Sequence, residues 1–190
     1  ILGVKHNYLL NESTYIRTVA MGSISRNTYI QDNFLPDGTK YRATDVEDMN
    51  NSYTITSFIN KKFNARINAR AGVNSQTYSI STFVDNRDEN PDLDEDGIPD
   101  LQRERDFNGY LPLLQTFVQT QFKINNRLTL NTGLHAQLLT FNNSYAVEPR
   151  FALNYNLGKS HVLNFGYGLH SQMQPLPVFF LEIEDDNGVP

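Results

Sequence analysis

Apolar and polar residues alternate along much of the chain, most regularly between residues 128 and 169. Three segments in this stretch carry an apolar residue at most alternate positions, with amides, glycines and histidines among the residues between them. Successive side chains of a β-strand point to opposite faces of the sheet, so each segment has one apolar and one polar face. The pattern therefore predicts an antiparallel meander with two unlike faces. Its apolar positions are Leu128, Leu130, Leu134, Ala136 and Leu138, then Phe151, Leu153, Tyr155 and Leu157, then Leu163, Phe165, Tyr167 and Leu169.

The same pattern elsewhere in the chain raises the expected number to roughly seven or eight strands. Short polar turns separate several of these strands, whereas two long polar segments, about 31–52 and 85–112, are predicted as loops. Short turns on one rim and long loops on the other are typical of outer-membrane barrels, whose long loops face the exterior. The predicted strands are 3–10, 14–29, 53–60, 65–83, 113–124, 128–141, 148–157 and 162–170, and the short turns are 61–64, 125–127 and 158–160.

Amino-acid composition indicates whether the apolar face contacts lipid or a protein core. The chain has 190 residues, 39% of them hydrophobic, and a mean hydropathy of −0.48, yet it contains ten Tyr and twelve Phe. A disordered chain would be poor in aromatics. A transmembrane barrel combines a polar lumen with aromatic girdles at the two membrane interfaces. Low mean hydropathy with many aromatic residues therefore favours an all-β, up-and-down transmembrane barrel.

Several other classes of protein are excluded or disfavoured. No apolar run approaches the ~20 residues of a membrane-spanning helix, and no charged and apolar leader precedes the first polar stretch. The chain has no cysteine, so it contains neither disulfides nor thiolate metal ligands. Its net charge of −5 gives no reason to expect nucleic acid as a partner.

Ionisable and amide residues on the predicted polar face bear on the size of the barrel. Arg66, Arg70, His135 and Gln137 fall at polar positions and are expected to face the lumen. An eight-stranded barrel is just wide enough to be filled by side chains. These long polar residues suit a wide, wet or plugged lumen instead, so the chain is expected to be a fragment of a larger barrel domain.

Two runs near the end of the chain carry a family resemblance. They are EPRFALNYNL at 148–157 and GYGLHSQMQPLP at 166–177, and the run VKHNYLL at 4–10 adds to them. Together they resemble strands of TonB-dependent outer-membrane receptors of the Bacteroidota. The resemblance implies a barrel of about 22 strands. It further implies uptake of a scarce ligand, such as a siderophore, metal complex or glycan, without catalytic residues. The implied partners are outer-membrane lipid, TonB and a plug domain outside this chain, with the presence or absence of a surface lipoprotein lid as alternatives.

One acidic motif lies in the second predicted loop. Asp92, Asp94, Asp96 and Asp100 alternate with other residues around Gly97. Carboxylates at this spacing, with glycine for a sharp turn, are typical of Ca²⁺-binding loops. The motif departs from the EF-hand pattern at the twelfth place, where Arg103 replaces the bidentate glutamate. The alternatives are a calcium site and a solvated acidic loop.

Other residues admit a binding or catalytic interpretation. His135, His161 and His170 with Ser171 could belong to a barrel hydrolase, although no Asp lies near them in sequence. Arg66 and Arg70 could attract an anionic ligand, and the alternative is pairing with carboxylates of the plug or lumen. Tyr155, Phe165 and Tyr167 could bind a sugar or heme, and the alternative is a membrane-facing girdle. Besides the hydrolase, the rival to the transporter is a soluble, calcium-stabilised β-sandwich that serves adhesion.

Overall fold

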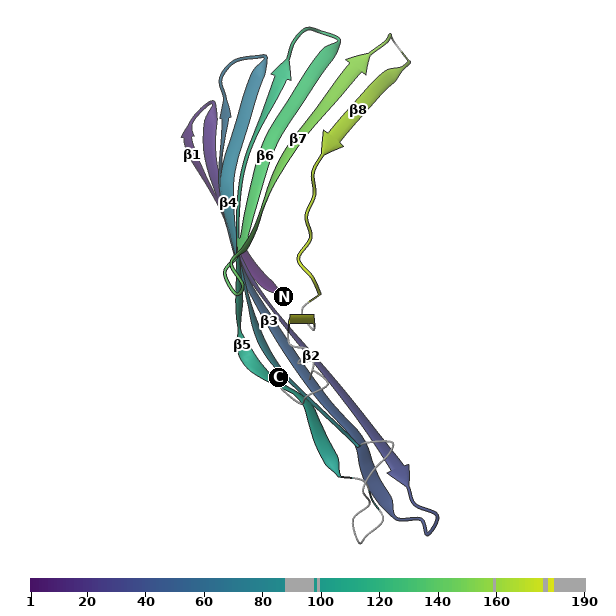
Figure 1. Cartoon of the computed structure of the whole chain (residues 1–190). Helices are drawn as coiled ribbons and strands as arrows, with labels where there is room; N and C mark the ends of the chain where they lie inside the picture. The colour runs from purple at the N-terminus through teal and green to yellow at the C-terminus, as the bar shows by residue number, and fades with distance from the viewer. Residues whose placement is uncertain (88–97, 99, 159, 176–177, 180–190) are drawn as a thin grey trace. The chain divides into compact units, whose positions relative to one another are not determined.

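The computed structural model describes residues 1–87, 98, 100–158, 160–175 and 178–179. These residues form eight β-strands in one sheet, and each strand pairs with its neighbours in sequence, in the order β1 to β8 (Figure 1). The predicted all-β antiparallel meander is confirmed. The strands are β1 Leu2–Asn11, β2 Thr14–Phe34, β3 Lys40–Lys62, β4 Ile67–Arg87, β5 Leu101–Lys123, β6 Leu128–Leu139, β7 Ser144–Asn156 and β8 Val162–Gly168.

The sheet formed by these described residues is open, with β1 and β8 at its two edges. An edge strand presents backbone N–H and C=O groups on one side without a partner strand. Helices long and apolar enough to cross a membrane do not occur within the described residues.

Strand register places like residues opposite one another across β5 to β8. Leu134 of β6 lies between Val118 of β5 and Pro149 of β7. On the other side of the same strand, Asn131 is opposite Gln121. Because opposed residues of an antiparallel pair share a face, the apolar positions of neighbouring strands form one continuous apolar face and the amides form the other.

Two of the predicted short turns are built in the same way. The side-chain oxygen of Asn64 accepts hydrogen bonds from the backbone N–H groups of Arg66 and Ile67, at 2.8 and 2.9 Å. Asn125 does the same for Arg127 and Leu128, again at 2.8 and 2.9 Å. An asparagine that bonds to its own backbone replaces part of the lost sheet pairing, which explains why both turns carry asparagine at this place.

The two segments predicted as long loops, 31–52 and 85–112, consist largely of β-strand, so the loop prediction is wrong for most of their described residues. β2 continues to Phe34 and β3 begins at Lys40, so the first connection is only 35–39. Pro36 and Asp37 lead there into Gly38, which has the positive φ of 89° that glycine tolerates best. In the second segment, β4 extends to Arg87 and β5 begins at Leu101. Residues 88–97 and 99 lie outside the described residues.

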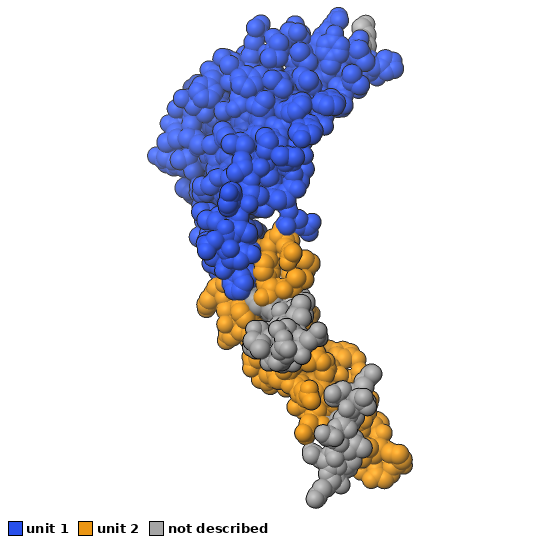
Figure 2. All heavy atoms as spheres, in the orientation of Figure 1, with its two compact units in different colours: residues 1–23, 52–78, 111–172 blue, residues 24–51, 79–110, 173–190 orange. Residues whose placement is uncertain are grey.

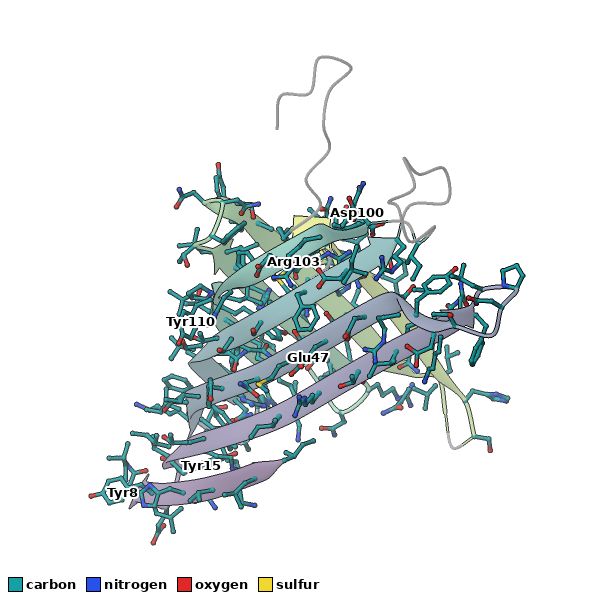
Figure 3. All side chains as sticks on the ribbon, turned by 90° about the horizontal axis from the view of Figure 1, so that it is seen from below. Tyr8, Tyr15, Glu47, Asp100, Arg103 and Tyr110 are labelled. Carbon is teal, nitrogen blue, oxygen red and sulfur yellow. The ribbon has the colours of Figure 1, made fainter. Side chains whose placement is uncertain are left out.

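The prediction missed these extensions because both of their faces are polar, so they lack an apolar alternation. Ion pairs between side chains bridge neighbouring strands instead. Asp32 of β2 accepts from Lys40 and Arg42 of β3 at 2.8 and 2.6 Å. Arg103 of β5, labelled in Figure 3, pairs with Asp85 of β4 at 2.7 Å.

The described chain divides into two compact units, coloured in Figure 2. Unit 1 comprises 1–23, 52–78 and 111–172 and has Phe58, Leu111 and Leu139 among its buried residues. Unit 2 comprises 24–51, 79–110 and 173–190, and its described residues include the ion-paired extensions of β2 to β5. The alternating apolar and polar faces described above belong to unit 1.

The Arg103–Asp85 pair predicts a pH dependence of stability. Hydrogen bonds from Arg103 lower the pKa of the Asp85 carboxyl. A depressed folded-state pKa stabilises the protein above the unfolded value of about 4, and this contribution is lost as pH falls through the folded value. We expect Asp85→Asn to melt below wild type at pH 7, and the difference to shrink below about pH 4. Thermal unfolding followed by circular dichroism across pH measures this, with Glu104→Gln as a control. An equal difference at every pH would contradict the assignment.

Candidate functional site

Side-chain amides form a chain of hydrogen bonds across the polar face of unit 1. Gln121 of β5 donates to Asn131 of β6 at 3.2 Å, and Asn131 donates to Asn154 of β7 at 3.1 Å. Asn154 continues the chain to Asn164 of β8 at 2.6 Å. An amide both donates and accepts, so Asn131 and Asn154 each bond to the strands on either side. The amides therefore tie four strands together through a row of uncharged, hydrophilic side chains.

A second row of polar contacts crosses the same face. Asn74 of β4 accepts from Thr56 and donates to Gln115, both at 2.7 Å. Gln115 donates to Gln137 at 3.3 Å, and Gln137 donates to Ser171 at 2.7 Å. Ser171 follows β8 in sequence and also bonds to Glu148 of β7, so this row ends on the segment after β8.

An arginine stacked on aromatic rings lies between the two rows. The guanidinium carbon of Arg70 is 3.6 Å from the ring centre of Phe58 and 5.3 Å from that of Phe117. Planar guanidinium groups stack favourably on aromatic faces. Gly72 makes room for this arrangement, because a Cβ there would lie 2.5 Å from the Cβ of Phe58 and 3.0 Å from the ring of Phe117.

A hollow of about 480 Å³ opens on the polar face beside Arg70. Its lining comes from β3 to β7 and is rich in amides. Two arginines, Arg70 and Arg150, are the charged residues of the described lining. The size lies within the range of small-molecule sites. The amides that line it are Asn60, Asn68, Gln119, Gln121 and Asn131.

Glu148 of β7 is the buried acidic residue of the polar face, only 2% exposed. It accepts hydrogen bonds from Arg150, from the backbone N–H of Ser171 at 2.7 Å and from the Ser171 hydroxyl. His135 Nδ1 lies 3.1 Å from the same carboxylate. This density of partners offsets the cost of burying the charge. The cluster fixes the start of the segment after β8 against the sheet.

Of the four residues predicted to face the lumen, three lie on strands and one lies in a turn. Arg70, His135 and Gln137 lie on strands and share the polar face through the contacts above. Arg66 lies in the turn before β4, where its carbonyl accepts the N–H of Lys123. Whether this face lines a lumen stays a prediction.

The histidines and Ser171 of the hydrolase alternative are only partly brought together. Ser171 and His135 contact opposite oxygens of Glu148, so the carboxylate stands between the hydroxyl and the imidazole. A nucleophile–base pair needs the hydroxyl hydrogen-bonded to the base itself. Among the described residues, neither His161 nor His170 forms a hydrogen bond with Ser171, and the expectation of a chain without catalytic residues stays a prediction.

The calcium motif is largely outside the described residues, since Asp92, Asp94 and Asp96 belong to 88–97. Asp100, labelled in Figure 3, is exposed and directly precedes β5. The calcium interpretation therefore stays a prediction.

The aromatic candidates lie on the apolar face. Phe165 and Tyr167 are more than half exposed, and Phe151 contacts both rings at centroid distances of 5.8 Å. Tyr155 is opposite Leu163 on this face. Whether these aromatic residues bind a sugar or heme or form a membrane-facing girdle stays a prediction.

Sequence reasoning missed Glu148 as a site residue and missed the stacking of Arg70. The sequence did contain a signal for Glu148. It lies two residues from Arg150 on the same strand, so the two side chains share a face and can pair. The rings under Arg70 come from β3 and β5, the two neighbours of its own strand, and only the register decides which side chains of these strands meet.

No protein-family model matches this chain, and no curated protein matches it in sequence.

Gly72 provides a test of the packing beneath Arg70. We expect Gly72→Ala to destabilise the protein by about 1–3 kcal/mol, because the new methyl group would overlap Phe58 Cβ and the Ser57 carbonyl oxygen. Urea unfolding measures the change. Gly166→Ala is a matched control on the same face, where the closest atom to an added Cβ is 3.9 Å away. Equal stability of the two variants would contradict the packing described.

Glu148 provides a test of the contact between β7 and the segment after β8. We expect Glu148→Ala to accelerate hydrogen exchange of the Ser171 amide, which loses its acceptor. Exchange followed by mass spectrometry over peptides spanning 168–172 measures this. Glu12→Ala removes an exposed carboxylate elsewhere and should leave the exchange unchanged. Unaltered exchange in Glu148→Ala would mean that the segment is held by other contacts.

Proposed function

We propose that this chain forms part of the wall of a transmembrane β-barrel belonging to an outer-membrane receptor. In this proposal the apolar face of unit 1 contacts lipid and the polar face lines the lumen. The receptor binds a scarce ligand from the exterior and releases it inward with energy supplied through TonB. A plug domain outside this chain closes the barrel. The ligand is a siderophore, metal complex, glycan or similar molecule.

The observation that carries the proposal is an apolar face without a charged residue across β5 to β8. Strand registers make this face continuous, and every Asp, Glu, Lys and Arg of the paired stretches falls on the other side. An Arg or Lys at the middle of a bilayer costs a barrel about 2–4 kcal/mol, so lipid selects for such a face. The residues at its centre are Leu114, Val118, Phe122, Leu130, Leu134, Leu138, Phe151, Leu153, Leu163 and Phe165.

Exposure of this face supports lipid rather than a protein core as its neighbour. Val118, Leu134 and Phe165 are 47%, 45% and 57% exposed, although they lie in the middle of paired strands. A β-sandwich would cover such a face with a second sheet. The residues described form one sheet. An uncovered apolar surface of this extent requires an apolar partner.

Strand length and turn chemistry also fit. β6 and β7 have 12 and 13 residues, slightly more than the ~9–11 that cross a bilayer when tilted. Tight asparagine turns join β3 to β4 and β5 to β6, as expected at the periplasmic rim. The open edges at β1 and β8 are consistent with further strands completing a wider barrel, as the resemblance implies. Closure and a total of about 22 strands belong to the proposal.

Membrane fractionation of the intact protein tests the proposal directly. We expect it in the outer membrane, with an electrophoretic mobility that changes when the sample is heated, because closed barrels resist detergent until heated. Leu134→Arg should reduce assembly through its cost of about 2–4 kcal/mol. Gln137→Arg is the matched control, since it lies three residues away on the opposite face near Glu148.

A soluble product without a mobility shift would overturn the proposal. It would favour a soluble binding module, and calcium titration of the protein would then test the acidic motif. Equal assembly of the Leu134→Arg and Gln137→Arg variants would contradict the assignment of the two faces.

A further inference from the structure

The hollow on the polar face has a positive lining in a chain whose net charge is −5. Its described lining contains Arg70 and Arg150 but neither Asp nor Glu. A second hollow of about 260 Å³ shares both arginines, together with Gln119 and Gly133. Both arginines therefore line the same concave part of the polar face.

The two arginines differ in their partners. Arg150 already pairs with Glu148. The side chain of Arg70 forms no ion pair or hydrogen bond among the residues that the structure describes, and its Nε is buried without an acceptor. A buried donor without an acceptor costs free energy. Stacking on Phe58 and Phe117 orients the guanidinium but provides no acceptor. Arg70 is thus held in place with an unused capacity to bind an anion.

Small residues explain why the face is hollow here. Gly133 of β6 and Ala152 of β7 line the hollow among long amides. A Cβ at Gly133 would meet its nearest atoms at 3.4 and 3.5 Å, which is ordinary contact. Backbone packing therefore does not demand glycine at this position. The effect of glycine here is to leave the hollow free of a side chain.

The rest of the lining indicates what else the occupant carries. Five amides surround the arginines, and each offers both a donor and an acceptor. Such a lining suits a hydroxyl-bearing molecule, since a hydroxyl group also donates and accepts. An arginine fits a carboxylate through two parallel N–H bonds.

We propose that this hollow binds a small hydroxylated carboxylate, of which a sugar acid is the simplest kind, with Arg70 holding the carboxylate and the amides holding the hydroxyl groups. The inference rests on the geometry of unit 1 and not on membrane insertion, so it can fail or succeed separately from the transporter proposal.

Calorimetric titration of the intact purified protein with D-galacturonate tests the proposal. We expect saturable binding that weakens about tenfold or more in Arg70→Gln, as the loss of a charge-assisted hydrogen bond implies. Arg66→Gln is the matched control, because it removes the same charge from the nearby turn and should bind as wild type does. Galactose lacks the carboxylate and should bind at least about tenfold more weakly. Gly133→Gln should also weaken binding, by filling the hollow without changing its charge.

Each remaining outcome overturns the proposal. Failure of wild type to bind either galacturonate or glucuronate would exclude the ligand class. Equal binding by Arg70→Gln and Arg66→Gln would place the ligand elsewhere. A third result is the absence of binding together with a lower melting temperature for Arg70→Gln than for Arg66→Gln. It would show that Arg70 stabilises the sheet, through its stacking on Phe58 and Phe117, and does not hold a ligand. Correct folding of each variant is checked by its circular dichroism spectrum.

Discussion

The two-residue period of the β-strand is the constraint on which the rest of this structure depends. One strand with alternating residues has two faces, but a sheet has two faces only when every register agrees. Here Gln121, Asn131, Asn154 and Asn164 join through their side chains across four strands. A slip of one residue in any of these pairings would place amides among leucines. The amide chain and the apolar face thus enforce the same register from opposite sides.

As a result, large apolar side chains are exposed on one face of unit 1, and a charged side chain is buried on the other. The large apolar residues of unit 1 are half exposed on one face, whereas the best-buried polar group, Glu148, lies on the other. A soluble domain reverses this relation. Side chains on the polar face are held in place by directional contacts. These are the hydrogen bonds around Glu148, the rows of amides and the stacking of Arg70 on aromatic rings. Such contacts require defined partners, which is why this face also has a defined hollow.

Sequence reasoning succeeded where alternation was strong and local. The meander, its two faces and the short turns followed from segments such as 128–138, because apolar period alone determines them. It failed for 40–52 and 101–110, where ion pairs such as Arg42 with Asp32 replace apolar pairing and polar residues occupy both faces. It also could not assemble Arg70 with Phe58 and Phe117, because the two rings lie on the neighbouring strands β3 and β5 rather than on β4 itself. Contacts of that kind depend on which strands become neighbours and in which register.

The order of the strands has a consequence for how the chain reaches this state. Each strand from β1 to β8 pairs only with the strands next to it in sequence. Every pairing therefore closes a loop no longer than one hairpin, and the entropy lost at each step stays small. The sheet can lengthen one hairpin at a time, each completed strand offering its edge as the template for the next. Assembly along such a path needs no long-range encounter between distant parts of the chain.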